Sequence, residues 1–211
     1  MNVVDLFSGY GGASEAFVES GDLVRRYELD ISVCDIVPHS VQIDLSRFRS
    51  EDEIEWFWNA RCMRQNFRDP WIDLVWASPP CREFSRAYNA PQAEAERAGI
   101  EYTPTDGLAL VEAAIRIIKK LEPKYWVIEN VAGARKWLEP ILGPPRQVIG
   151  PYCLWGNFPE IIVPRETDFQ PKCMKAGGHD RHSVQKRSVI PIEISRGLRE
   201  AINCPTLERW I

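Results

Sequence analysis

The sequence predicts an α/β fold: a doubly wound, mostly parallel sheet with helices on both faces. Three observations support this prediction. Short apolar runs alternate with amphipathic segments along the first two thirds of the chain. Polar residues follow several of the apolar runs directly, and a glycine-rich turn follows the first of them. This alternation is typical of strands joined by crossover helices, with ligands held at the carboxyl ends of the strands.

Composition sets the limits on class. The chain has 211 residues, of which 45% are hydrophobic and 27% charged, as expected of one globular domain spanning residues 1–211. No apolar run approaches the ~20 residues of a membrane span, so we expect no membrane association. The first expected strand begins at Asn2 or Val3, which leaves no room for a leader, and this favours a cytoplasmic protein.

The charge distribution says less about partners. A net charge of −4 disfavours strong non-specific binding to nucleic acid. Two basic clusters could still form a local basic surface or a solvated face: Arg61, Arg64 and Arg68, and the stretch from Lys172 to Arg187.

Six scattered cysteines without a Cys-x-x-Cys pair are typical of reduced thiols. Four soft ligands occur in the second half: Cys153, Cys173, His179 and His182. Their spacing fits no zinc module, so we expect no metal.

The first element is a strand over residues 3–7, followed by Ser8-Gly9-Tyr10-Gly11-Gly12 and a helix from about Ala13 to Glu19. Such a turn lets a ligand approach the backbone beside a helix N-terminus. A dinucleotide fingerprint would place a third glycine where Ser14 stands, so the pattern gives little support to NAD binding.

The second strand is expected to end at Tyr27–Asp30. The third strand is expected over Val41–Leu45, with Asp44 as another carboxylate near its end. An acidic residue at the end of the second strand, Glu28 or Asp30, could accept the hydroxyls of a ribose, or could be an ordinary turn residue. A helix from Glu51 to about Arg64 follows, with its aromatic residues in the core.

The stretch from Asp73 to Cys81 is the centre of the pattern. Leu74–Ala77 predicts a short buried strand, which Pro79 and Pro80 end at once. Cys81 then stands at the carboxyl end of a strand. It could be a buried structural cysteine, the commoner case, or a nucleophile.

Residues 82–104 lack an apolar period and predict a mobile loop beside Cys81, with a helical turn over 93–98. A helix from Asp106 to near Pro123 and a strand over 125–128 ending in Glu129-Asn130-Val131 come next. The rest of the chain predicts turns after Pro140 and a short segment that ends at Pro159. A polar loop over 164–189 and a last helix over 190–203 follow.

Four of these pieces together resemble the cytosine-C5 DNA methyltransferase family. The resemblance is carried by Asp5-Leu-Phe-Ser-Gly-Tyr-Gly-Gly12, by Ser78-Pro-Pro-Cys81 with Phe84-Ser85, by Glu129-Asn130-Val131 and, less closely, by 152–159. The stretch 187–202 is similar to the family's C-terminal helix, which packs beside the cofactor loop. The resemblance implies a Rossmann-like class I S-adenosylmethionine-dependent methyltransferase fold.

The resemblance also implies the chemistry. Cytosine C5 is too weak a nucleophile to attack a sulfonium, and addition of a thiolate to C6 makes C5 enamine-like. Cys81 would be that thiolate, and Glu129 would hold cytosine at N3 and the exocyclic amine. Arg146 and Arg187 are the candidates for the family's base-contacting arginine.

The remaining roles are carried over by position. Residues expected to bind S-adenosylmethionine, and S-adenosylhomocysteine as product, are Asp5, Phe7, Ser8, Gly9, Gly11, Gly12, Glu28, Leu29, Asp44, Leu45, Pro80 and Leu110. Residues expected near the substrate base are Ser78, Pro79, Ser85 and Asn130.

The chain departs from the family pattern in its second half. Only about residues 160–187 stand where a target-recognition domain would lie, too few for an independent core. Val189-Ile190-Pro191 replaces the usual Gly-Asn, and Arg82 follows the cysteine where glutamine is common. In size and layout the chain resembles small phage and prophage methylases.

Three functions therefore remain open. The first is methylation of cytosine C5 in DNA, with a flipped base and with a separate specificity partner as one source of recognition. The second is the same chemistry on a free cytidine nucleotide, RNA or single-stranded DNA. The third is a non-catalytic cofactor-binding subunit or decoy.

Overall fold

A computed structural model describes residues 1–50, 52–55, 71–167, 169 and 189–204. Its centre is a seven-stranded sheet in the order β3-β2-β1-β4-β5-β7-β6. The strands are β1 (Asn2–Leu6), β2 (Leu23–Glu28), β3 (Ser40–Gln42), β4 (Leu74–Ala77), β5 (Tyr125–Val131), β6 (Gln147–Ile149) and β7 (Tyr152–Asn157). The α-helices are α1 (Glu15–Glu19), α2 (Ile31–Cys34), α4 (Pro91–Ala98), α5 (Thr105–Leu121), α6 (Arg135–Leu142) and α8 (Ile192–Asn203). Two 3-10 turns, η1 (Leu45–Arg47) and η3 (Ala132–Ala134), and a helical stretch at 52–55 complete the described elements.

The sheet is mostly parallel, which confirms the predicted fold class. Strands β1 to β5 all pair in parallel, whereas β7 runs antiparallel to both β5 and β6. The order reverses direction at β1, from which the chain moves outward first through β2 and β3 and then through β4 and β5. Such a reversal opens a crevice at the carboxyl ends of the strands, where ligands bind in open α/β sheets.

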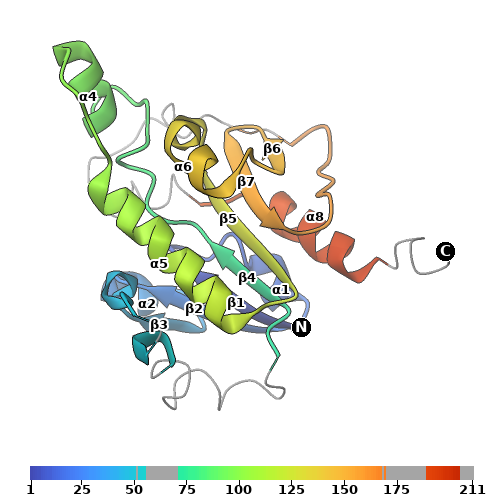
Figure 1. Ribbon diagram of the computed structural model, residues 1–211. Helices are drawn as coiled ribbons and strands as arrows, with labels where there is room; N and C mark the ends of the chain where they lie inside the picture. The colour runs from blue at the N-terminus through green and yellow to red at the C-terminus, as the bar shows by residue number, and fades with distance from the viewer. Residues whose placement is uncertain (51, 56–70, 168, 170–188, 205–211) are drawn as a thin grey trace.

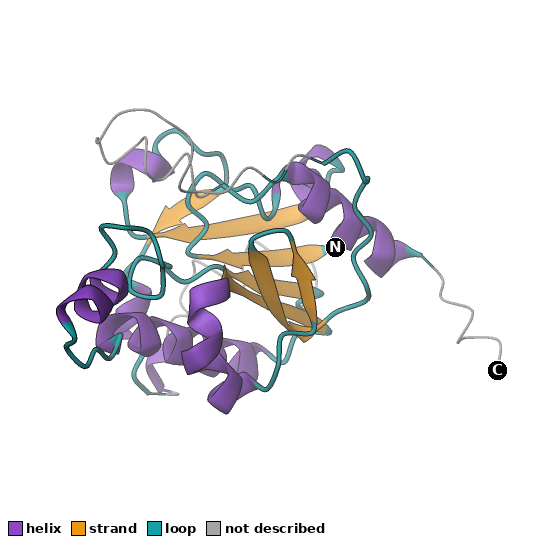
Figure 2. Ribbon diagram, turned by 90° about the horizontal axis from the view of Figure 1, so that it is seen from above, coloured by secondary structure: helices purple, strands orange, loops and turns teal. Residues whose placement is uncertain are grey.

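Helices cover both faces of the sheet (Figures 1 and 2). Alternate strand residues supply the two cores: Val4, Val75 and Ile128 on one face, and Val3, Leu74 and Val127 on the other. The first face is covered by α5, α6 and η1, and the second by α1 and α8. Burial on both sides explains why the central strands read as continuous apolar runs.

The third strand is shorter than predicted. It ends at Gln42, and the chain turns into η1 at Leu45 instead of continuing as a strand. The Asp44 side chain accepts hydrogen bonds from the Ser46 amide at 3.0 Å and from the Ser46 hydroxyl at 2.5 Å. This local cap competes with strand pairing, and apolar content alone does not reveal it.

The helix α6 was not predicted: the predicted elements pass from the strand that ends in Glu129-Asn130-Val131 to the turns after Pro140. Pro140 lies in the last turn of this eight-residue helix. Leu138 is fully buried and Leu142 packs against the same core, so burial of one face outweighs the amide that proline lacks. The predicted helical turn at 93–98 is likewise a full helix, with Pro91 in its first turn and Gly99 as a left-handed C-cap.

The other predicted elements are confirmed with small shifts. The first helix begins at Glu15 instead of Ala13, and β5 ends in the Glu-Asn-Val triplet, as predicted. Several predictions fall outside the described residues: the later part of the 51–64 helix, both basic clusters, and three of the four soft ligands. None of the described helices is both long enough and apolar enough to cross a membrane.

Candidate cofactor and base site

The glycine-rich turn after β1 has an unusual backbone. Phe7, Gly9 and Gly11 all have positive φ, at 57°, 49° and 75°. For Phe7 this region is strained, as is common where a loop must present its backbone to a ligand. The Ser8 amide donates to the Tyr27 carbonyl at 3.1 Å, which ties the turn to the end of β2.

Glu28, the last residue of β2, belongs to this turn. One oxygen of its carboxylate accepts a hydrogen bond from the Gly9 amide at 2.8 Å. The other oxygen accepts from the Leu29 and Asp30 amides, at 2.9 and 3.1 Å. The acid thus stands at the mouth of the glycine turn, where it can still accept from the hydroxyls of a ribose. Asp30, the alternative to Glu28, instead caps α2.

A buried polar group supports the turn from below. Arg26, 1% exposed, donates from Nε to the Ser14 hydroxyl at 2.9 Å and from Nη2 to the Gly11 carbonyl at 3.0 Å. Ser14 in turn donates to Asp5 at 2.6 Å, and Arg26 pairs with Glu15 at 2.6 Å. Because Arg26 lies in contact with Gly11, a Cβ at position 11 would fall 2.4 Å from its guanidinium carbon.

Asp5 is completely buried in this group. Burial raises its pKa to about 6, against the lowering effects of the Ser14 hydrogen bond and the Arg26 charge. Its Oδ1 has no hydrogen-bond partner among the described residues. Asp5 therefore contacts Ser14 in the interior, and its carboxyl group is not exposed at the surface of the glycine turn.

The C-terminal helix lies beside the turn, as the resemblance implies. A Cβ on Gly12 would meet the Ile190 carbonyl oxygen at 2.2 Å, and the Ala16 amide donates to the Ser195 hydroxyl at 3.2 Å. Gly12 is thus explained by close packing against the segment Val189-Ile190-Pro191, which fills the place of the family's Gly-Asn.

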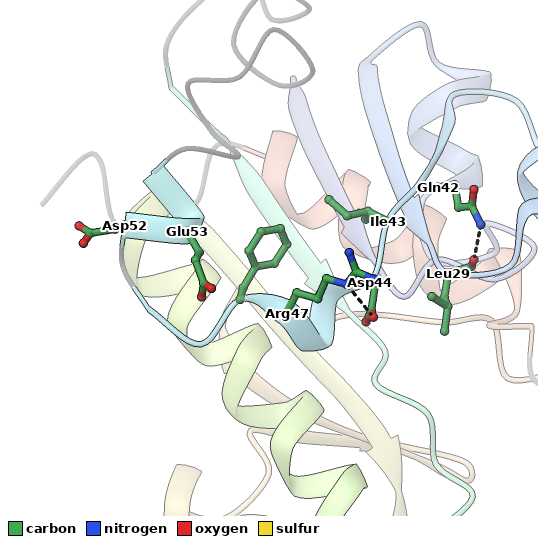
Figure 3. A pocket seen from close by; sticks show the side chains of 8 residues that line it. Leu29, Gln42, Ile43, Asp44, Arg47, Asp52 and Glu53 are labelled. Carbon is green, nitrogen blue, oxygen red and sulfur yellow. Dashed lines mark hydrogen bonds and ion pairs between the residues drawn. The ribbon is translucent and has the colours of Figure 1, made fainter.

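A pocket of about 720 Å³ lies along the ends of β2 and β3 and begins at Leu29, the residue after Glu28. Figure 3 shows Leu29 and Gln42 on one side of it and Asp52 and Glu53 on the other. Its lining residues are Leu29, Gln42, Ile43, Asp44, Arg47, Phe48, Asp52 and Glu53. Two residues expected to bind the cofactor, Leu29 and Asp44, therefore line this pocket, whereas the side chain of Leu45, also expected there, is buried in the core. Hydrogen bonding to Ser46 is the main cause of the lowered pKa of Asp44.

The predicted nucleophile follows β4. The Ser78 amide donates to the Leu6 carbonyl at 3.1 Å, and the Trp76 indole donates to the Ser78 hydroxyl at 2.8 Å. Cys81 is partly exposed and is not in a disulfide. This exposure argues against the alternative of a buried structural cysteine.

The turn after Cys81 is tightly held. The Phe84 amide donates to the Cys81 carbonyl at 3.1 Å, and the Phe84 side chain is fully buried. A Cβ on Gly133 would fall 2.0 Å from the Phe84 carbonyl oxygen, so only glycine allows this approach. The Gly107 amide donates to the Glu83 carboxylate at 2.6 Å, which joins the turn to α5.

The Glu-Asn-Val triplet is joined directly to the Pro-Pro-Cys motif. The Asn130 amide donates to the Pro79 carbonyl oxygen at 3.1 Å, and its Oδ1 accepts from the Val131 amide at 2.9 Å. Glu129 is 4% exposed on the next strand beside β4. Cys81 and Glu129 thus stand at the carboxyl edge of the sheet, close to the glycine turn after β1.

Other predicted site residues lie elsewhere or are less informative. Arg146 is exposed, and its guanidinium lies 5.5 Å from the Phe158 ring centre, at the end of β7 away from Glu129. Arg187 is outside the described residues. The Ser85 hydroxyl accepts from the Ala87 amide at 3.1 Å, and Leu110 is half-buried on α5. Their roles, and that of Pro80, stay predictions.

Sequence reasoning missed two residues of the site. Arg26 follows Val24 by two positions on β2 and shares its buried face, a period-two signal that could have marked it as a buried cation. Tyr152 begins β7, is 4% exposed, and stands two residues before Leu154, the partner of Glu129 in the antiparallel ladder. No sequence signal pointed to it, because its place depends on antiparallel pairing with β5.

Comparison with known proteins agrees with this geometry. The family model described as C-5 cytosine-specific DNA methylase matches residues 1–137. A Frog virus 3 protein named "Probable DNA (cytosine-5)-methyltransferase" is 29% identical over 161 residues, covering 75% of this chain and 65% of the relative. The type II methyltransferase M1.HphI of Haemophilus parahaemolyticus is 30% identical over 139 residues, covering 63% of this chain and 32% of the relative.

Among solved structures, the Entamoeba histolytica methyltransferase EhMeth aligns with a TM-score of 0.43 and 18% identity, covering 81% of this chain and 55% of that one. The chain thus spans less than two thirds of the curated relatives it matches. The family model nevertheless covers more than half of the chain, including the glycine turn, Cys81 and Glu129. The chain belongs to the C-5 cytosine-specific DNA methylase family.

Proposed function

We propose that this protein transfers a methyl group from S-adenosylmethionine to C5 of cytosine in DNA, through a covalent bond between Cys81 and C6. The observation that carries the proposal is the hydrogen bond from Asn130 to the Pro79 carbonyl. It holds the strand that bears Glu129 against the turn that bears Cys81, so that a thiol and a carboxylate can act on one base.

The glycine turn fits a nucleoside-bearing cofactor. The turn has positive φ at Phe7 and Gly9, and there is open space beside Gly9, so a ligand can approach its backbone amides. The carboxylate of Glu28 adds a hydrogen-bond acceptor at the same place. The pocket beyond Leu29 offers apolar and acidic groups to an adenine. S-adenosylmethionine, when bound there, supplies an electrophilic methyl group.

The residues of the chain supply the remaining chemistry. The Cys81 thiolate adds to C6, and the electron pair of the C5–C6 bond becomes available at C5. Glu129 holds N3 and the exocyclic amine and stabilises the charge that the addition places on the ring. After C5 has gained the methyl group, loss of its proton restores the double bond and expels the thiolate of Cys81.

The substrate is proposed from the family and from relatives named for DNA methylation. With only about residues 160–187 in place of a target-recognition domain, a specificity partner or a substrate other than duplex DNA fits the same site. The experiment below therefore compares duplex DNA with the alternative substrates.

The test measures transfer from labelled S-adenosylmethionine to duplex DNA, single-stranded DNA, RNA and cytidine nucleotides. Substrates containing 5-fluorocytosine should trap a covalent complex with wild type, because fluorine does not leave as a proton does. Cys81→Ser should neither transfer nor trap. Cys204→Ser, which changes an exposed thiol elsewhere, is the matched control and should behave as wild type.

Each outcome is decisive. Transfer only to RNA or nucleotide would replace DNA as the substrate, and equal trapping by wild type and Cys81→Ser would refute the covalent mechanism. A wild-type protein that binds cofactor but transfers to no cytosine substrate would favour a non-catalytic subunit.

A further inference from the structure

We propose that Tyr88 and Arg97 form a stacking platform for an unpaired base of the substrate strand, close to the target cytosine. The inference rests on the proposed function and adds to it a binding contact outside the base site itself. It gives a function to the segment between β4 and α5, which the proposed chemistry uses only at Cys81.

The two side chains form an exposed cation–π pair. The guanidinium carbon of Arg97 lies 4.1 Å from the centre of the Tyr88 ring. Nη2 of Arg97 also donates to the main-chain carbonyl of Tyr88 at 2.7 Å. Tyr88 is nevertheless 76% exposed. Because the guanidinium covers one face of the ring, this exposure leaves the opposite face open to a planar group.

The segment that carries the pair is anchored on both sides of Tyr88. Phe84 is fully buried, and a Cβ on Gly107, near the start of α5, would fall 2.9 Å from its ring. After Tyr88, Gln92 in the first turn of α4 is buried. Contacts already made by Tyr88 and Arg97 reduce the entropy that these side chains lose when a base binds.

The platform is close to the nucleophile. The Phe84 amide donates to the Cys81 carbonyl at 3.1 Å, which closes a turn over residues 81–84. This turn spans less than ~7 Å and four further residues span at most ~14 Å, so the Cα atoms of Cys81 and Tyr88 lie within about 21 Å. Such a distance is about six base steps of a stacked strand. Figure 1 shows α4 standing out beyond the start of α5, on the side toward which β4 runs.

The charges around the pair favour a base over a phosphate. Glu94 and Glu96 are exposed on the same helix as Arg97, so α4 presents no net positive charge to a phosphate. An aromatic ring backed by a guanidinium instead matches the surfaces on which single-stranded nucleic acid stacks, since every base has a π face. The occupant that fits this chemistry is therefore a base that has no pairing partner.

Unpaired bases arise beside the target in two ways. Extrusion of a cytosine from a duplex disturbs the stacking of its neighbours, and a protein surface that stacks a base offsets part of that cost. In a single-stranded substrate the neighbours are unpaired from the start. The platform should therefore improve binding of single strands more than binding of closed duplex.

The experiment measures binding of a single-stranded oligonucleotide with one cytosine, in the presence of S-adenosylhomocysteine. Tyr88→Ala should raise Kd by about tenfold, in line with the loss of one stacked base. Tyr88→Phe keeps the ring and should stay within twofold of wild type. Trp71→Ala is the matched control, because Trp71 is 74% exposed just before β4, at the opposite end of that strand, and should bind as wild type does.

An abasic scan locates the contact. Single bases are removed in turn over about six positions on each side of the target, and one position should raise the Kd of wild type by about tenfold. Tyr88→Ala should lose nothing further at that position. The slope of log Kd against log salt should be the same in both proteins, because the substitution removes no cation. 2-Aminopurine placed there should be quenched by wild type and not by Tyr88→Ala.

Each result decides for or against the platform. Binding by Tyr88→Ala that equals wild type, or equal abasic losses in both proteins, would overturn the inference and leave the exposed pair to a protein partner. The scan with wild type needs no variant, so the absence of any position-specific loss refutes the platform even if Tyr88→Ala does not fold.

The two proposals fail in different ways. Wild type that transfers methyl groups to cytosine but shows no position-specific loss keeps the proposed function and refutes the platform. Wild type that transfers to no cytosine substrate refutes the proposed function itself, and the inference with it.

Discussion

The side-chain amide of Asn130 donates a hydrogen bond across 3.1 Å to the main-chain carbonyl oxygen of Pro79. The two residues are 51 positions apart in the chain, and Asn130 is 1% exposed. A buried carbonyl at the end of β4 would lose its partner without this amide, which costs about 1–3 kcal/mol. The bond thus connects the nucleophile turn to the strand that carries Glu129.

Asn130→Asp should impair methyl transfer more than it impairs folding, because it sets a carboxylate oxygen against the Pro79 carbonyl. We expect a fall in kcat of at least tenfold and a loss of stability of about 2 kcal/mol, measured by transfer assay and urea unfolding. Asn157→Asp is the matched control, because Asn157 donates to the Lys124 carbonyl at 3.2 Å in an exposed position. Equal kcat values in the two variants would contradict this role.

Arg26→Met should destabilise the protein by about 2–3 kcal/mol, since it leaves the buried Gly11 carbonyl and the Ser14 hydroxyl without their charged donor, whereas the lost pair with Glu15, whose side chain is 41% exposed, adds little. Cofactor affinity should fall as well, because the glycine turn loses its support. Thermal unfolding and calorimetric titration with S-adenosylhomocysteine measure the two effects. Arg196→Met removes an exposed pair with Glu19 and should cost less than about 1 kcal/mol. A loss of stability no larger than in this control would contradict the role of Arg26.

The buried carboxyl of Asp5 should make stability depend on pH. Its pKa is raised from 3.8 to about 6, so between these values the native state binds more protons than the unfolded state. Stability from this group therefore falls as the pH rises from about 4 to 6, by about 3 kcal/mol in total.

Asp5→Asn should remove this dependence, so its stability relative to wild type should increase between pH 4 and pH 7 in urea unfolding. Ser14→Ala removes the hydrogen bond that lowers the pKa of Asp5, so the fall in stability should become larger and extend to higher pH. A difference between Asp5→Asn and wild type that is constant with pH would show that Asp5 is not titrating in this range.

Gly133→Ala should displace the turn after Cys81, because the added methyl group would lie 2.0 Å from the Phe84 carbonyl oxygen. We expect loss of transfer by at least tenfold and slower labelling of 5-fluorocytosine substrates. Gly21→Ala is the control for backbone strain, since Gly21 has φ of 77° but open space around its Cβ position. It should cost about 1 kcal/mol of stability and leave transfer unchanged. Comparable activity of both alanine variants would exclude this account.

The order of elements and the motif residues could be predicted from the sequence because both are local properties. An apolar run ended by Pro79 and Pro80 specifies a strand and its end, and adjacent glycines specify a turn that few other residues allow. The same local signals gave wrong element boundaries where a side-chain cap or the burial of one face determined the local structure. Asp44 ended β3 by bonding to Ser46, and the buried face of α6 outweighed Pro140.

Motifs read along the chain were enough to predict the parallel α/β fold, the glycine turn, and Glu28, Cys81 and Glu129 as candidate site residues. The contacts around them are visible only in the folded protein: Arg26 against Gly11, Ile190 against Gly12, and Tyr152 diagonal to Glu129. These contacts join residues from separate elements, and their energy depends on burial and register. A linear pattern carries neither quantity, because both arise when the strands pair and the faces of the sheet are covered.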